Sequence, residues 1–155
     1  MNLPARPEHI LILTGEPSGD LHGGRLAQQI RQLCPSACLS GIGGPEMEKE
    51  NVDLFFTIDR LSVMGFTEIL FQFRDIKDAF DRFREQLRRQ PPDLVILIDY
   101  PGFNLKAAQY VKTHYQIPVL YYITPKVWAW KKSRLKKIRQ FVDHAALILP
   151  FEEKL

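Results

Sequence analysis

Residues 94–104 read LVILIDYPGFN, and this stretch decides the fold. Its first five residues are all apolar, so both faces of the strand that they predict must be covered. Strands of that kind belong to parallel sheets with helices on both sides. An acid, Asp99, follows directly, and a Pro-Gly pair comes two residues later. The pattern therefore predicts a buried parallel strand that ends at a polar loop.

Shorter apolar runs and longer amphipathic runs alternate over the rest of the 155 residues. The further strands that we expect lie at residues 9–13, 38–42, 54–57, 119–123 and 145–149. The helices that we expect lie at residues 18–33, 45–50, 66–89, 103–115 and 131–141. This alternation predicts one α/β domain, with a Rossmann-like parallel sheet and helices on both faces.

Three of these helices have an apolar stripe that we expect to face the sheet, because its members recur at steps of three and four residues. The stripes are Leu26, Ile30 and Leu33 in the first long helix, Ile69, Phe73, Ile76, Phe80, Phe83 and Leu87 in the second, and Leu105, Ala108 and Val111 in the third.

The composition is ordinary for a globular protein, with 45% hydrophobic and 25% charged residues. No run of about 18 apolar residues is present, and no long apolar core follows the first residues. We therefore expect neither a membrane span nor a signal peptide. Cys34 and Cys38 have no second Cys or His pair at zinc spacing, so we expect reduced thiols and no metal.

Basic residues are concentrated near the carboxyl end of the chain. The run holds no acid and consists of Lys126, Lys131, Lys132, Arg134, Lys136, Lys137 and Arg139. It suits an anionic partner such as a phosphate, a nucleic acid or a lipid surface, and it equally suits a solvated helix face.

The loop at residues 14–20 (TGEPSGD) follows a strand and opens a helix, a position that favours an anion. It has neither the dinucleotide-binding glycine pattern nor a P-loop. A second interpretation is structural: Ser18 caps the helix, and Gly15 and Gly19 permit a tight turn.

Three further loops carry candidate chemistry. Residues 41–45 (GIGGP) let the backbone approach a ligand closely, or they form a simple turn. Asp99 can act as a general base, or it can cap a helix or pair with a cation. Trp128 and Trp130 lie among lysines, which suits a phosphorylated sugar, although tryptophans also serve as core residues.

Taken in order, these loops resemble the lipid-A-disaccharide synthase family. The matching motifs are GExSGD at 15–20, GIGGPxM at 41–47, LSVMG at 61–65, IDxPxFN at 98–104, PxVWAW at 125–130 and LPFE at 149–152. They cover nearly the whole chain.

The resemblance implies the amino-terminal, acceptor-side half of a two-domain glycosyltransferase B fold. The nucleotide-sugar domain would then lie outside these residues, and we expect the isolated chain to be inactive. The implied reaction joins UDP-2,3-diacylglucosamine to 2,3-diacylglucosamine 1-phosphate with inversion, giving the disaccharide 1-phosphate and UDP. It requires no cofactor. The implied location is the cytoplasmic face of the bacterial inner membrane, with a homodimer of the full-length protein left open.

The resemblance also assigns residues. Asp99 matches the family's proposed base. The positions that it places at the substrates are Gly15, Glu16, Ser18, Gly19, Asp20, Gly43, Gly44, Met64, Asn104 and Trp128. Apolar side chains near the start of the second long helix are expected to meet acyl chains or the bilayer, or else they all belong to the core: Phe66, Ile69, Leu70, Phe71 and Phe73.

Two departures from the family pattern stand out. Gly102 replaces a frequent Asp, which leaves Asp99 as the only acid of its loop, and Lys126 replaces a small residue. Two rival functions remain open. One is a transferase or epimerase that acts on a soluble UDP-sugar, against which the Phe-rich residues 66–73 argue. The other is a flavodoxin-like module that binds nucleic acid. The basic helix lacks the aromatics needed for stacking, so we expect no nucleic-acid partner.

Overall fold

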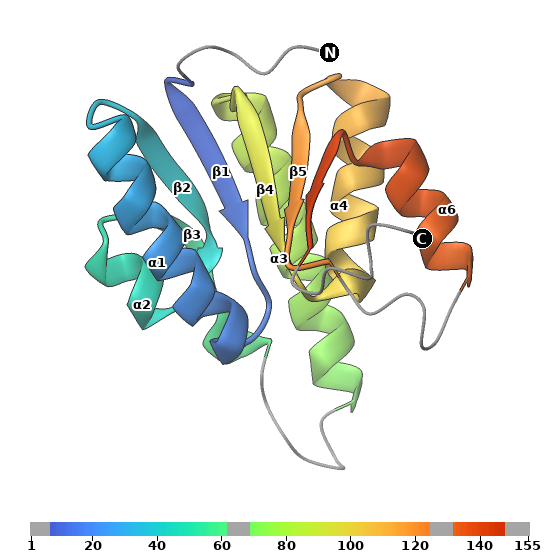
Figure 1. Cartoon of the computed structure of the whole chain (residues 1–155). Helices are drawn as coiled ribbons and strands as arrows, with labels where there is room; N and C mark the ends of the chain where they lie inside the picture. Colours follow the sequence, from blue (N-terminus) through green and yellow to red (C-terminus); the bar gives the residue numbers. More distant parts are fainter. Residues whose placement is uncertain (1–6, 62–68, 125–131, 148–155) are drawn as a thin grey trace.

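The computed structural model describes residues 7–61, 69–124 and 132–147. They form a six-stranded, wholly parallel sheet in the order β3-β2-β1-β4-β5-β6 (Figure 1). The strands are β1 (His9–Leu13), β2 (Cys38–Gly43), β3 (Asp53–Thr57), β4 (Leu94–Ile98), β5 (Val119–Tyr122) and β6 (His144–Ala146). This order is that of a dinucleotide-fold sheet, and it confirms the predicted fold class.

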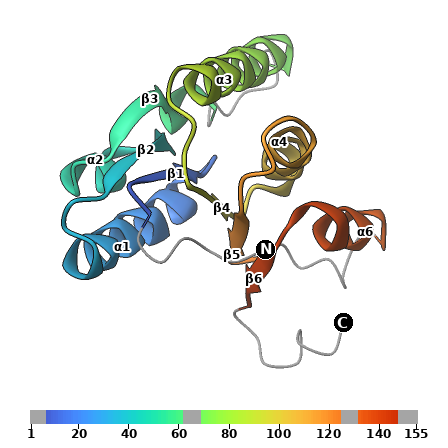
Figure 2. The same ribbon diagram turned by 90° about the horizontal axis from the view of Figure 1, so that it is seen from above.

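Helices cover both faces of the sheet (Figure 2). One face carries α1 (Pro17–Leu33) and α2 (Pro45–Lys49), and the other carries α3 (Ile69–Arg89), α4 (Pro101–His114) and α6 (Lys132–Phe141). A short 3-10 helix, η1 (Ile58–Arg60), follows β3 and was not expected from the sequence.

The core has two layers because neighbouring residues of a strand point to opposite faces. In β1, Leu11 and Leu13 join the cluster under α3 and α4, whereas Ile10 and Ile12 join the cluster under α1 and α2. All four side chains are at most 2% exposed. The covered-strand prediction is therefore confirmed for β1, and it holds equally for residues 95–98 of β4.

The expected helix stripes are confirmed in α4, where Leu105, Ala108 and Val111 are buried. They are also confirmed over most of α3, where Phe83 and Leu87 are buried and Ile76 and Phe80 pack against the core. They are wrong at two helix ends, since Leu33 is 83% exposed and Phe73 is 67% exposed. The first turns of α3 extend past the sheet in Figure 1, so a side chain there can meet solvent although its spacing fits the stripe.

In α1, Leu26 and Ile30 of the expected stripe are partly buried and pack against the core. The fully buried positions of this helix are instead small residues and one acid: Gly19, Asp20, Gly23, Gly24 and Ala27. A Cβ at Gly24 would lie 2.6 Å from the carbonyl oxygen of Glu46, so glycine lets α1 approach α2 closely. A search for apolar periodicity misses such a face, because glycine scores as neither apolar nor polar.

Element boundaries otherwise agree with the expected ones to within a few residues. α4 begins at Pro101 rather than at residue 103. β6 spans His144–Ala146, whereas the strand was expected at residues 145–149, of which 148 and 149 lie outside the described part of the chain. Among the described helices, none combines the length and the apolar character needed to cross a membrane.

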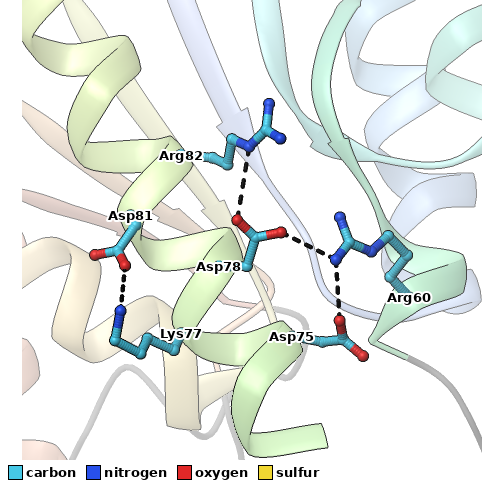
Figure 3. Close-up of polar contacts among 6 residues, drawn as sticks. All are labelled: Arg60, Asp75, Lys77, Asp78, Asp81 and Arg82. Atoms are coloured by element: carbon cyan, nitrogen blue, oxygen red, sulfur yellow. Dashed lines mark hydrogen bonds and ion pairs between the residues drawn. The ribbon is translucent and has the colours of Figure 1, made fainter. Parts of the chain in front are cut away.

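An ion-pair cluster joins η1 to α3 (Figure 3). The Arg60 Nη2 atom lies 3.1 Å from Asp75 Oδ1 and 2.9 Å from Asp78 Oδ2, and the guanidinium stacks 4.7 Å over the Phe56 ring. Arg82 adds a longer contact of 3.6 Å to Asp78. The cluster anchors α3 next to the end of β3.

Candidate active site at the carboxyl edge of the sheet

The strand order reverses between β1 and β4, and crevices at such switch points are the usual ligand sites of open α/β sheets. The loops after these two strands meet there, at the lower edge of the sheet in Figure 1. Gly15 lies against the ring of Tyr100 so closely that a Cβ at residue 15 would overlap the ring. The first and third candidate loops of the sequence are therefore brought together.

Backbone geometry marks the same place. Five described non-glycine residues have positive φ: Asn51, Asp99, Tyr100, Gln116 and Ile123. Asn51 and Gln116 follow the ends of α2 and α4, and their N–H groups donate to the carbonyls of Glu48 and Val111, as in ordinary helix caps.

The other three left-handed residues need a different explanation. Asp99 (φ 44°) and Tyr100 (φ 43°) follow β4, and Ile123 (φ 63°) follows β5. A left-handed conformation is unfavourable for Tyr100 and above all for β-branched Ile123, and such conformations tend to persist at functional sites. Within the described backbone, strain is therefore concentrated at the carboxyl ends of β4 and β5.

Two buried side chains donate hydrogen bonds to the main chain of the turn at Asp99. Tyr121 Oη donates to the Asp99 carbonyl at 2.6 Å, and Asn104 Nδ2 donates to the same oxygen at 2.7 Å. Asn104 Nδ2 also lies 3.1 Å from the carbonyl oxygen of Ile98 and 3.4 Å from that of Leu13. Asp99 itself is half-buried.

Asn104 was expected at the substrate, but its side chain is 0% exposed and its described donor contacts are to main-chain carbonyls. It therefore shapes the loop in this structure. Tyr121 was not among the candidate residues. Burial, followed by the negative charge of Asp99, raises the pKa of its phenol far above the usual range, with Asn104 and Arg134 acting in the opposite direction.

The first loop places two polar side chains at the start of α1. The helix begins at Pro17, and the residue at the cap position is Glu16, not Ser18. Ser18 Oγ instead donates to Glu16 Oε1 at 3.0 Å, and both side chains reach solvent. The capping interpretation of Ser18 is thus wrong. Gly19 packs against Thr14, where a Cβ would overlap the threonine hydroxyl.

Asp20 links the first loop to the second. Its carboxylate is 2% exposed and accepts N–H bonds from Gly44 (2.7 Å), Glu46 (2.9 Å) and Met47 (3.1 Å) at the start of α2. A Cβ at Gly44 would lie 2.8 Å from Asp20 Oδ2, which explains the glycine. A Cβ at Gly43 would likewise overlap the sulfur of Met47. Asp20 therefore acts on the backbone of the second loop.

Several expected site residues lie outside the described part of the chain. These are Met64, Phe66, Trp128 and the side chains of Ile69, Leu70 and Phe71. Gly102 is exposed, and a Cβ there would meet nothing within 4 Å, so a side chain fits at this departure from the family pattern. Cys34 and Cys38 are both free thiols. Within the described ranges no cluster of His, Cys, Asp or Glu is arranged to hold a metal ion.

The fold and the position of the crevice define one class of protein. Solved structures with this arrangement include MurG of Acinetobacter baumannii, with a TM-score of 0.60 and 18% identity over 93% of this chain and 42% of that chain. The glycosyltransferase SnogD of Streptomyces nogalater matches with a TM-score of 0.53 and 15% identity over 91% of this chain and 44% of that one. The chain thus has the fold of one half of a glycosyltransferase B enzyme.

The family follows from the sequence. Residues 10–155 match the model of the lipid-A-disaccharide synthetase family, and the chain belongs to that family. The lipid-A-disaccharide synthase of Coxiella burnetii is 49% identical over 146 residues, and that of Trichlorobacter lovleyi is 43% identical over 147 residues. These matches cover 94% and 95% of this chain but only 39% and 38% of the relatives, so the chain spans about two fifths of their length.

Proposed function

We propose that this chain is the acceptor-side half of an inverting glycosyltransferase of lipid A synthesis. The whole enzyme would transfer 2,3-diacylglucosamine from its UDP conjugate to the 6-hydroxyl of 2,3-diacylglucosamine 1-phosphate. The products would be the β-1,6-linked disaccharide 1-phosphate and UDP. Family membership supports the glycosyltransferase class, and the named substrates rest on the resemblance of the loop motifs.

One observation carries the mechanism: Asp99 stands at the switch point, half-buried, on a strained turn that buried donors hold in place. A sugar hydroxyl is a weak nucleophile, and a positioned base that removes its proton contributes roughly 10²- to 10⁴-fold to the rate. We assign this role to Asp99. The carboxylate would accept the proton of the acceptor 6-hydroxyl while the oxygen displaces UDP from the anomeric carbon, which inverts that carbon.

The neighbouring loops would form the walls of the acceptor site. Glu16 and Ser18 present polar atoms at the start of α1, and the tight packing of Gly15 and Gly19 lets the backbone approach the crevice. Arg134, in the first turn of α6, is close enough to Tyr121 to influence its pKa. Its charge can therefore act on a phosphate bound at the same edge.

The assay needs both halves of the enzyme. It uses the complete protein that contains this chain or, if the chain is itself complete, a chimera in which it replaces the matching segment of the Coxiella burnetii relative. We call either one the assay protein. Incubation with both lipid substrates should give a disaccharide 1-phosphate by mass spectrometry, with a β anomeric coupling by NMR. Absence of product, or an α linkage, would contradict the proposal.

We also propose that the enzyme lies on the cytoplasmic face of the inner membrane, because both substrates are lipids. Two features of the described surface support this placement. Phe73 is 67% exposed near the start of α3, and Lys136, Lys137 and Arg139 are exposed on α6, on the same side of the sheet (Figure 2). Apolar insertion and basic residues together are a common means of peripheral binding.

A matched pair of serine substitutions tests the membrane surface. Phe73→Ser should weaken co-sedimentation of the assay protein with anionic liposomes several-fold and leave its thermal stability nearly unchanged. Leu33→Ser removes an exposed leucine from α1, on the opposite face of the sheet, and should leave liposome binding unaltered. Equal binding by both variants and the unmodified protein would argue against the surface.

A further inference from the structure

The carbonyl oxygen of Asp99 receives an unusual amount of support. Two buried side chains donate to it, Tyr121 from β5 and Asn104 from α4, at 2.6 and 2.7 Å. A carbonyl oxygen has two lone pairs, and both are engaged here. Side chains from two separate elements thus converge on one main-chain atom of the proposed base.

The turn needs this support because its conformation is unfavourable. Asp99 and Tyr100 are both left-handed, and neither is glycine. Such residues persist only where the surrounding structure over-determines them. The backbone conformation of Asp99 sets the direction of its Cα–Cβ bond, so a support that holds the carbonyl also fixes the point from which the carboxylate extends.

We propose that Tyr121 is a positioning residue of the active site: its hydroxyl fixes the Asp99 carbonyl and thereby holds the Asp99 carboxylate toward the acceptor. The proposal rests on the function assigned above and deepens it. Tyr121 is 0% exposed, so it acts through Asp99 and makes no contact with substrate.

Two properties suit the tyrosine to this role. Its ring belongs to the core layer under α3 and α4, which fixes the position of the hydroxyl. Burial and the charge of Asp99 raise the pKa of the phenol, so it stays protonated and remains a donor at every working pH. A phenylalanine would fill the same volume and lose only the donor.

The test compares two adjacent tyrosines in the assay protein. Tyr121→Phe should lower kcat by about 10- to 100-fold, because a misplacement of the order of 1 Å costs that much. KM for both substrates should stay within about twofold of the parent value. Tyr122→Phe makes the same change on the other face of the sheet, where the ring packs against the α1 and α2 layer, and should leave kcat unchanged.

Two further variants distinguish the positioning role of Tyr121 from a purely structural role. Tyr121→4-aminophenylalanine keeps an N–H donor and should restore most of kcat. Asn104→Leu replaces the second donor to the same carbonyl by an apolar side chain of similar size and should also lower kcat at constant KM. It shows whether support of this carbonyl matters if Tyr121→Phe does not fold. An unchanged kcat in folded Tyr121→Phe, or a rise in KM without a fall in kcat, would overturn the proposal.

The failure of this inference and of the proposed function are distinguishable. If Asp99→Asn abolishes turnover while Tyr121→Phe is fully active, the positioning role is wrong and the base stands. If Asp99→Asn is itself active, the base assignment is wrong, and the positioning role falls with it.

Discussion

The two edges of the sheet use acidic residues in different ways. At the amino edge, Asp93 Oδ2 accepts the N–H groups of Glu8 and His9 at 2.8 and 2.9 Å, which joins the start of β1 to β4. Asp143 likewise accepts the N–H of Val119 at 2.8 Å and pairs with Lys112 at 2.9 Å. These carboxylates hold the main chain at the starts of the strands.

At the carboxyl edge Asp99 shows the opposite arrangement, because side-chain donors hold its own main-chain carbonyl. Strain is concentrated there too, since the left-handed residues that are not helix caps follow β4 and β5. Asp20 shows that position alone is insufficient, because it stands at the carboxyl edge and still binds backbone N–H groups. Asp99, the proposed base, thus differs from Asp20, Asp93 and Asp143 in that its main-chain carbonyl is held by side-chain donors.

The largest effect on stability is expected at Asp20. Asp20→Ala leaves three N–H groups at the start of α2 without their acceptor, and it should lower the free energy of unfolding by about 3 kcal/mol. Urea denaturation measures the change. Asp20→Asn keeps one acceptor oxygen and should lose less. Equal stability of Asp20→Ala and the parent would show that the carboxylate does not hold the second loop.

A pair of glycines gives the next effect. Gly15→Ala drives a Cβ into the Tyr100 ring and should cost about 2 kcal/mol of stability, as overpacking usually does. Gly102→Ala adds a Cβ within α4 where nothing lies within 4 Å, and it should stabilise the fold by about 0.5–1 kcal/mol. Thermal melts of the two variants should shift in opposite directions. An unchanged or raised melting temperature of Gly15→Ala would mean that Gly15 and Tyr100 do not meet as described.

The smallest expected effect is the pH dependence of stability that His9 contributes at the amino edge of the sheet. Burial lowers the pKa of His9 below its usual 6.5, partly opposed by the Pro91 carbonyl and by Asp93, and the ring contacts Ser40 Oγ at 2.7 Å. The folded state therefore binds the proton less readily than the unfolded state. Stability from this group is complete above pH 6.5 and falls, by at most about 1.4 kcal/mol per pH unit, as the pH drops toward the lowered pKa.

Replacing His9 tests whether this side chain causes the pH dependence. His9→Gln should remove this part of the pH dependence when unfolding free energies are compared at pH 7.5 and 5.5. An identical pH dependence in His9→Gln would rule out the histidine as its source.

The sequence predicted the fold class and the edge at which the candidate site lies, because the composition of each strand and the alternation of strands and helices along the chain can be read locally. The position of Asp99 follows from the apolar run before it. The partners of Asp20 could not be predicted, since they lie 24 to 27 residues away across two helices. Tyr121 was missed for a similar reason: a tyrosine in a buried strand is ordinary, and only the tertiary structure brings its hydroxyl to the Asp99 carbonyl.

The most direct test compares the two acids that flank β4. Asp99→Asn and Asp93→Asn make the same change at opposite ends of one strand, and both kcat and the free energy of unfolding are measured in the assay protein. Asp99→Asn should reduce kcat by at least about 10²-fold with little loss of stability. Asp93→Asn should cost about 1 kcal/mol of stability and leave kcat nearly intact. Near-normal turnover in Asp99→Asn, or a loss of kcat in Asp93→Asn that equals that of Asp99→Asn, would contradict the assignment of the base to the carboxyl edge.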